Sequence, residues 1–165
     1  MPVTVEEQLE RCGFGLFQCI AVTAFVLFII ADGMELVVTN ITWSVMPLEE
    51  WGATPADRAL VVSVAFFGFV VGAVFGALTG DTFGRRPLLY AHSLIFVPAS
   101  IFSALSTGLI MLISTRFLVG VSVGLVLPTA VALISEFTPK HFRGRAIIAL
   151  PGAFWVGFIH LRRKV

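Results

Sequence analysis

The sequence predicts an all-α integral membrane protein. Of its 165 residues, 58% are apolar, 16 are phenylalanine and only 13% are charged, and the mean hydropathy is +0.98. Such a composition excludes an ordinary soluble globule. A net charge of +1 gives no field that would attract nucleic acid. The expected surroundings of the chain are therefore a lipid bilayer, with no nucleic-acid partner.

Residues 1–16 are expected to form a cytoplasmic segment ahead of the membrane. Glu6, Glu7 and Glu10 outnumber the single Arg11, whereas a cleavable secretory leader begins with basic residues. The first hydrophobic helix is thus expected to be retained. Thr4 and Glu7 also match a capping box, which predicts a short surface helix, with a frayed tail as the equally weighted alternative.

Five hydrophobic segments follow, and a helix of about 20 apolar residues is enough to cross a bilayer core. Asp32 and Glu35 are the only charges of the first segment, and the second has none. A long apolar stretch is broken by Arg116 and by a polar run near Ser106, which divides it into the third and fourth segments. The fifth is short for a full crossing. The predicted segments are residues 17–39, 59–80, 88–105, 109–135 and 146–161 of a helical bundle covering residues 17–161.

The basic residues of the short loops predict the orientation. Arg85 and Arg86 follow the second segment, and Lys140, Arg143 and Arg145 follow the fourth. Because Lys and Arg favour the cytoplasmic side, the N-terminus is expected to be cytoplasmic in a multi-pass protein. The plasma membrane and an endomembrane remain equal candidates.

The basic tail, residues 162–165, conflicts with this orientation. Alternation places it outside, although Arg162, Arg163 and Lys164 would favour the inside. Either the fifth segment does not cross, or the tail is not the native continuation of a truncated chain. The second explanation is the one we expect.

Small residues recur at every fourth position along two segments. They are Gly68, Gly72, Gly76 and Gly80 on the second segment and Gly120 and Gly124 on the fourth. Small residues at this spacing let two helix backbones approach closely in lipid. A sliding helix and a static tight packing both fit the pattern, with the static packing slightly favoured. Pro98 and Pro128 predict helix bends.

Asp32, Glu35 and Arg116 are the candidate substrate or coupling residues, because ionisable groups inside a span are costly and mark functional sites. At the helical rise, the three lie about 28, 33 and 30 Å from the inner boundary. Asp32 and Glu35, three residues apart, share a helix face. We expect the two acids to face Arg116 across a cavity. Protonation of this charge pair, or its replacement by a substrate charge, would then drive a conformational switch. The alternative is that Glu35 only lies at the water interface.

A second candidate site is an inner gate at the cytoplasmic face. Gly84 is expected to free a tight turn, and Asp81 to dock on a helix N-terminus. The gate would further comprise Arg85, Arg86, Glu136 and Arg143. Such a charge network could latch one transporter state, and the simpler explanation is that the arginines only anchor the topology.

Motifs for enzyme chemistry are not apparent. His92, His141 and His160 share no metal-ligand spacing, and the sequence contains neither a nucleotide-binding loop nor a nucleophile elbow. We therefore expect no cofactor, no metal and no enzymatic activity.

Residues 80–86 resemble the loop between helices two and three of the major facilitator superfamily, Gly-x-x-x-Asp-Arg/Lys-x-Gly-Arg-Arg/Lys. Asp81, Gly84, Arg85 and Arg86 match this pattern, whereas Ala77 and Thr82 depart from it. Two further likenesses are the fourth-helix pattern Arg-x-x-x-Gly at Arg116 with Gly120, and the following Glu-x6-Arg-Gly link at Glu136 with Arg143-Gly144.

Within the superfamily, the chain is similar to the synaptic-vesicle-protein-related branch and to organic-ion and aromatic-acid:proton symporters. Asp32-Gly33-Met34-Glu35 is similar to the symporters' Asp-Gly-x-Asp element on helix one, with Glu in place of the second Asp. The resemblance implies that this element handles substrate and protons.

The resemblance also implies a twelve-helix fold in two halves, with the solute bound between them, of which this chain supplies about five N-terminal helices. The implied function is transport of a small, charged organic solute, coupled to protons or another cation, by alternating access. The missing helices or another polypeptide would be needed to complete the cavity. The alternative is a fragment without transport activity that pairs with a partner through its glycine-striped helices.

Overall fold

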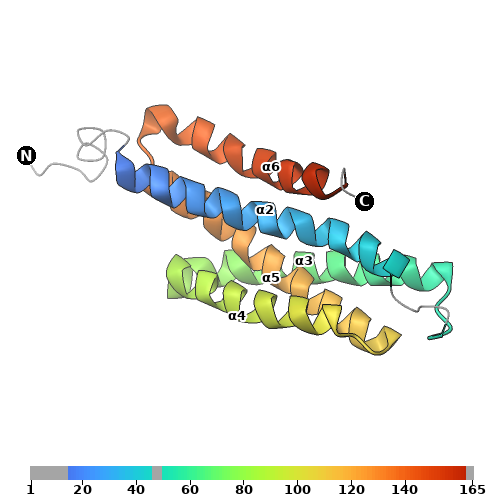
Figure 1. Cartoon of the computed structure of the whole chain (residues 1–165). Coiled ribbons are helices and arrows are strands. Elements are labelled where there is room, and N and C mark those ends of the chain that lie inside the picture. The colour runs from blue at the N-terminus through green and yellow to red at the C-terminus, as the bar shows by residue number, and fades with distance from the viewer. Residues whose placement is uncertain (1–14, 46–49, 163–165) are drawn as a thin grey trace, which may run out of the picture. The chain divides into compact units, whose positions relative to one another are not determined.

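The computed structural model describes residues 15–45 and 50–162 of the chain, and within them the secondary structure is helical (Figure 1). The helices are α2 (Leu16–Val45), α3 (Pro55–Phe83), α4 (Arg85–Ala104), α5 (Leu109–Phe137) and α6 (Lys140–Arg162). The predicted all-α fold class is confirmed. The surface helix expected near Thr4 lies outside the described residues.

Four of these helices are long and apolar enough to cross a membrane. Their apolar spans are Gln18–Glu35, Pro55–Gly80, Arg85–Ala104 and Leu109–Glu136. α6 does not meet the same criterion of length and hydropathy over its described residues. A crossing by α6 therefore stays a prediction.

α3 begins ahead of its hydrophobic stretch because Thr54 caps it. The Thr54 backbone N–H donates to Asp57 Oδ2 at 2.7 Å, and the Asp57 N–H donates to Thr54 Oγ1 at 3.4 Å. Pro55 occupies the first turn, where its missing N–H costs nothing. This reciprocal capping box satisfies backbone donors that the helix itself leaves open.

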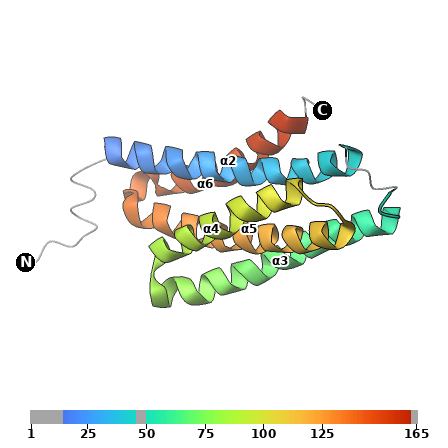
Figure 2. The same ribbon diagram turned by 60° about the horizontal axis from the view of Figure 1, so that its bottom comes forward.

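A single residue, Gly84, separates α3 from α4 and makes the two helices a hairpin, which Figures 1 and 2 show from two directions. Its φ of +84° is a conformation that residues with a β-carbon rarely adopt. A side chain at this position would therefore strain the turn.

The described helices divide between two compact units, residues 38–129 and residues 1–37 with 130–165. α2 and α5 each contribute to both units. In the unit of residues 38–129, α3 and α5 interlock through their glycines. A β-carbon added at Gly68 or Gly72 would collide with the backbone of Phe117 or Val121, respectively, and one at Gly120 would collide with the carbonyl oxygen of Ala65.

Gly76 and Gly124 continue this interlock. A β-carbon at Gly76 would lie 3.1 Å from the Leu125 carbonyl oxygen, and one at Gly124 would meet the Phe69 carbonyl oxygen and lie 2.7 Å from the Ala73 nitrogen. The glycine faces of α3 and α5 thus cover each other, so any pairing with another polypeptide would use other surfaces.

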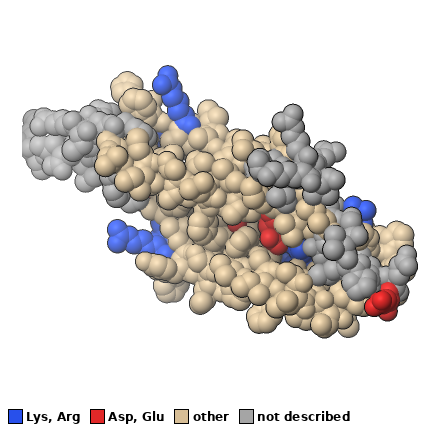
Figure 3. All heavy atoms as spheres, viewed as in Figure 1, with Lys and Arg blue, Asp and Glu red and all other residues tan. Residues whose placement is uncertain are grey.

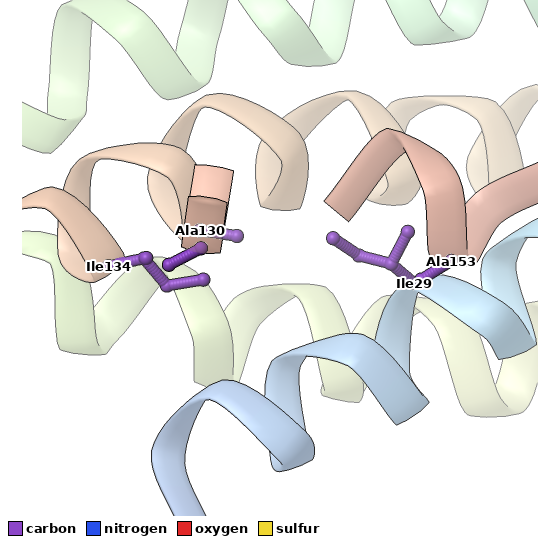
Figure 4. Close-up of a cluster of buried hydrophobic side chains, with 5 residues drawn as sticks. Ile29, Ala130, Ile134 and Ala153 are labelled. Atoms are coloured by element: carbon purple, nitrogen blue, oxygen red, sulfur yellow. The ribbon is translucent and has the colours of Figure 1, made fainter. Parts of the chain in front are cut away.

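The core of the other unit is a cluster of apolar side chains from α2, α5 and α6 (Figure 4). Its buried members are Ile29, Ala130, Ile134, Ala146 and Ala153. Three of the five are alanines, which allow helices to approach closely in a lipid environment.

Large apolar side chains remain exposed over the membrane helices. Examples are Phe67 (64% exposed) and Leu78 (70%) on α3, and Leu94 (77%) on α4. In the view of Figure 3, charged side chains occupy small separate areas and uncharged ones most of the described surface. Lipid tails solvate such a surface, and water would not.

Candidate functional site

The two acids of the first membrane helix lie within α2, and helical spacing places them on one face. Asp32 is 1% exposed, whereas Glu35 is half-buried. A carboxyl buried to this extent inside a membrane helix is costly to ionise unless a charged or polar group compensates it. The burial makes Asp32 the stronger of the two candidates for coupling.

Arg116 lies in the N-terminal part of α5 and is 2% exposed. It is the largest fully buried side chain among the described residues. Arginine keeps its positive charge in proteins, so its burial calls for compensation by acids, carbonyl oxygens or water. The preceding residue, Thr115, turns its hydroxyl back to the carbonyl oxygens of Met111 (3.0 Å) and Leu112 (2.9 Å) of its own helix.

Asp32 and Glu35 belong to the unit of residues 1–37 and 130–165, whereas Arg116 belongs to the unit of residues 38–129. The expected meeting of the acids with Arg116 stays a prediction. Asp32 and Arg116 are both deeply buried, as such a pair would require, and Glu35 is half-buried.

At the expected inner face, Arg85 and Arg86 are the first two residues of α4, half-buried and exposed respectively. Cations at a helix N-terminus oppose the helix dipole by about 0.3–1 kcal/mol each. The stability of α4 therefore does not explain the position of these two arginines. A role in membrane topology or in a charge network does explain it. Asp81 lies in the last turn of α3.

Glu136 is exposed near the end of α5, and Arg143 is half-buried in the first turn of α6. These two residues share one unit, and the arginines of α4 belong to the other. The inner gate as a single cluster consequently remains a prediction.

A buried polar pair that the sequence did not predict links α4 to α5. His92 and Ser122 are both 0% exposed. The His92 Nδ1 lies 2.8 Å from the Ser122 carbonyl oxygen and 2.8 Å from the Ser122 hydroxyl oxygen. The Ser122 hydroxyl also donates to the His92 carbonyl oxygen at 3.1 Å.

A carbonyl oxygen can only accept, so Nδ1 donates to the Ser122 carbonyl oxygen in the tautomer that carries the proton on Nδ1. The ring stacks on Phe96, with a centroid distance of 5.2 Å and an interplanar angle of 24°. Within the apolar helix α4, Ser122 thus contacts the edge of the imidazole and Phe96 contacts its face.

His92 could have been found from the sequence as an ionisable residue inside a hydrophobic segment, the criterion that selected Asp32. The spacing of the histidines, which was considered only for metal binding, did not select His92. Ser122 carried no such signal, because serine is common in membrane helices and its partner is thirty residues away in the sequence.

A sequence-family model described as "Sugar (and other) transporter" matches residues 19–159, which is most of the chain. Similar proteins include the "Niacin transporter NiaP" of Acinetobacter baylyi, 38% identical over 112 residues, which are 68% of this chain and 26% of the relative. The "4-hydroxybenzoate transporter PcaK" of Pseudomonas putida is 30% identical over 131 residues, 79% of this chain and 29% of the relative.

The "Putative transporter svop-1" of Caenorhabditis elegans is 30% identical over 152 residues, 92% of this chain and 29% of the relative. The chain therefore spans between 26% and 29% of the length of these three relatives. All three carry the name of a transporter and none that of an enzyme. Together with four apolar, membrane-length helices, the match over residues 19–159 shows that the chain belongs to the sugar (and other) transporter family of the major facilitator superfamily.

Proposed function

We propose that this chain is part of a transporter that moves a small, charged organic solute across a membrane in symport with protons. The relatives named above are transporters of niacin and of 4-hydroxybenzoate, two small aromatic acids. A solute of this class carries a carboxylate at neutral pH, which a buried cation can recognise. Arg116 is the candidate for that recognition.

The single observation that carries the proposal is the burial of Asp32 within a membrane helix. An acid in this position has two states that differ strongly in solvation cost, because the neutral form is tolerated in apolar surroundings and the anion is not. Uptake of a proton from one side and its release to the other would then follow a change in the access of Asp32 to water. Glu35, on the same helix face, would relay or share that proton.

The proposed coupling site consists of Asp32, Glu35 and Arg116, in which Arg116 neutralises either the acids or the bound solute. Competition between these two anions for one cation would link solute binding to proton binding. The inner-gate residues Asp81, Gly84, Arg85, Arg86, Glu136 and Arg143 are proposed to hold the closed cytoplasmic side.

Uptake of radiolabelled niacin and 4-hydroxybenzoate into proteoliposomes under an imposed inward proton gradient tests the proposal. The wild-type sequence and its Asp32→Asn variant are compared, both as the 165-residue chain and within any longer polypeptide that contains it. We expect Asp32→Asn to abolish the acceleration by the gradient. An equally large response to the gradient in the Asp32→Asn variant would rule out coupling through Asp32.

Glu50→Gln is the matched control, because Glu50 is an exposed acid outside the helices. It should leave the response to the gradient unchanged. Uptake by the longer polypeptide but not by the 165-residue chain would favour the alternative of a fragment without transport activity. If neither polypeptide took up niacin or 4-hydroxybenzoate, the proposed solute class would be contradicted.

A further inference from the structure

α4 has a buried face and an exposed face within the unit of residues 38–129. His92 lies on the buried face and joins it to Ser122 of α5. The buried residues of α4 are Leu88, His92, Ala99 and Ser103. Because the helix is long and apolar enough to cross a membrane, its exposed face is the one that meets the membrane lipids.

The exposed face of α4 begins with a cation and an aromatic ring. Arg86 is exposed at the end of the apolar span, and Tyr90 is 77% exposed. Because an α-helix rises about 1.5 Å per residue, Tyr90 lies about 6 Å further along α4, one turn beyond Arg86. The exposed residues that follow at helical spacing are apolar, namely Leu94, Val97 and Ile101. This order of charge, aromatic ring and apolar surface matches the order of headgroup, interface and acyl chain in a lipid leaflet.

The turn between α3 and α4 adds a second aromatic ring and a positive charge to this surface. Phe83, the last residue of α3, is 72% exposed. Asp81 against Arg85 and Arg86 leaves residues 80–90 with one positive charge, and the first turn of α4 contains no acid. Arg85 is half-buried and Arg86 is exposed, so the contact with lipid falls to Arg86. The charge of this surface is complementary to that of an anionic headgroup.

We propose that Arg86, Tyr90 and Phe83 form a binding surface for an anionic phospholipid. The Arg86 guanidinium binds the lipid phosphate as a charge-assisted hydrogen-bond donor, and the Tyr90 hydroxyl donates to the same headgroup. The acyl chains lie along Leu94 and Val97. A zwitterionic lipid offers the same phosphate but carries its own ammonium group, so its net attraction to Arg86 is smaller. This surface goes beyond the proposed transport activity and does not depend on any solute.

Quenching of tryptophan fluorescence by brominated phospholipids tests the surface at one position. The three native tryptophans of the full chain are replaced by phenylalanine, and Leu94→Trp places a single reporter one turn beyond Tyr90. The protein is reconstituted in mixtures of phosphatidylcholine and phosphatidylglycerol, of which one or the other carries bromine on its acyl chains. We expect phosphatidylglycerol to bind next to the reporter about fivefold more strongly than phosphatidylcholine, the effect of one cation near an anionic headgroup.

Arg86→Gln should remove this preference for phosphatidylglycerol, because it removes the cation of the surface. Arg86→Lys keeps the charge and should retain most of the preference, and Tyr90→Phe, which loses only the hydroxyl, should reduce it. Arg58→Gln is the matched control, since Arg58 is an exposed arginine near the opposite end of α3. The control should leave the preference unchanged.

A second reporter, Ile110→Trp, lies at the other end of the membrane, where Ile110 is 82% exposed at the start of α5. Its quenching should not respond to Arg86→Gln. Equal binding of the two lipids next to the Leu94→Trp reporter, or a preference that survives Arg86→Gln, would overturn the proposal. Displacement of phosphatidylglycerol by inorganic phosphate would also overturn it, because the site would then bind soluble phosphate. Transport is not measured, so failure of the lipid surface and failure of the proposed function are distinguishable.

Discussion

His92 of α4 and Ser122 of α5 form a reciprocal contact, in which the side chain of each residue lies at hydrogen-bond distance from the main-chain carbonyl oxygen of the other. The ring Nδ1 lies 2.8 Å from the Ser122 carbonyl oxygen, and the Ser122 hydroxyl lies 3.1 Å from the His92 carbonyl oxygen. Both residues are inaccessible to solvent. Polar contacts between membrane helices stabilise modestly, by about 0.6 kcal/mol on average and up to about 1.7 kcal/mol.

Ser122→Ala should therefore lower the free energy of unfolding by about 1 kcal/mol. The variant removes the hydroxyl and its bond to His92 but keeps the carbonyl oxygen that accepts from Nδ1. Reversible unfolding in mixed micelles measures the change. Ser114→Ala is the control on the same helix, because the Ser114 hydroxyl is exposed and donates to the carbonyl oxygen of Ile110 in its own helix. Equal effects of the two variants would show that the link between the helices contributes nothing.

Gly72→Ala should destabilise the unit of residues 38–129, because its β-carbon would collide with the main chain of Val121. Backbone atoms cannot move aside as a side chain can, and overpacking of this kind costs about 1–3 kcal/mol. The same unfolding measurement provides the test.

Two glycine variants are matched controls for Gly72→Ala. A β-carbon at Gly80 would lie 3.4 Å from the end of the Leu88 side chain, and one at Gly152 would have no neighbour within 4 Å. Alanine is the better helix former by about 1 kcal/mol, so Gly80→Ala and Gly152→Ala should be neutral or stabilising. A loss of stability as large in these controls as in Gly72→Ala would refute the interlock as the cause.

Thr54→Ala should fray the first turn of α3 and cost about 1 kcal/mol, the usual effect of losing an N-cap side chain. The Asp57 and Arg58 amides, which donate to the Thr54 carbonyl oxygen at 3.0 and 3.4 Å, should exchange faster with solvent. Thr54→Ser keeps the capping hydroxyl and should behave as wild type. Unchanged exchange at Asp57 in the Thr54→Ala variant would argue against the cap.

The fold class could be predicted from sequence because hydrophobic length and loop charge act locally. The ends of the helices depend on other features. α3 begins at Pro55, ahead of the hydrophobic segment predicted from residue 59, because the cap formed by Thr54 and Asp57 and the proline determine where the helix starts. The threonine, proline and aspartate of this capping box were visible in the sequence.

The glycine pattern predicted close contact on α3 and α5, but spacing alone could not identify the partner. The structure pairs the two stripes with each other. The choice between a static packing and a sliding helix stays a prediction. The contact of His92 with Ser122 could not be predicted in this way, because the sequence separation of thirty residues is bridged only once α4 and α5 pack. The candidate charge pair of Asp32 and Arg116 was selected by its cost in lipid, a criterion that identifies each residue but not their separation.

A double-mutant cycle on Asp32 and Arg116 addresses the separation directly. Removal of one partner of a buried pair leaves the other charge uncompensated, so Asp32→Asn and Arg116→Gln should each destabilise strongly. If the two side chains are paired, the double variant should be less destabilised than the sum of the single variants by about 1–3 kcal/mol. Unfolding in mixed micelles at neutral pH measures all four proteins. Combining Glu50→Gln with Arg116→Gln provides the additive reference, since Glu50 is exposed outside the helices. If the free-energy changes of Asp32→Asn and Arg116→Gln were additive, the two side chains would not interact. Arg116 would then be a candidate for binding the solute only.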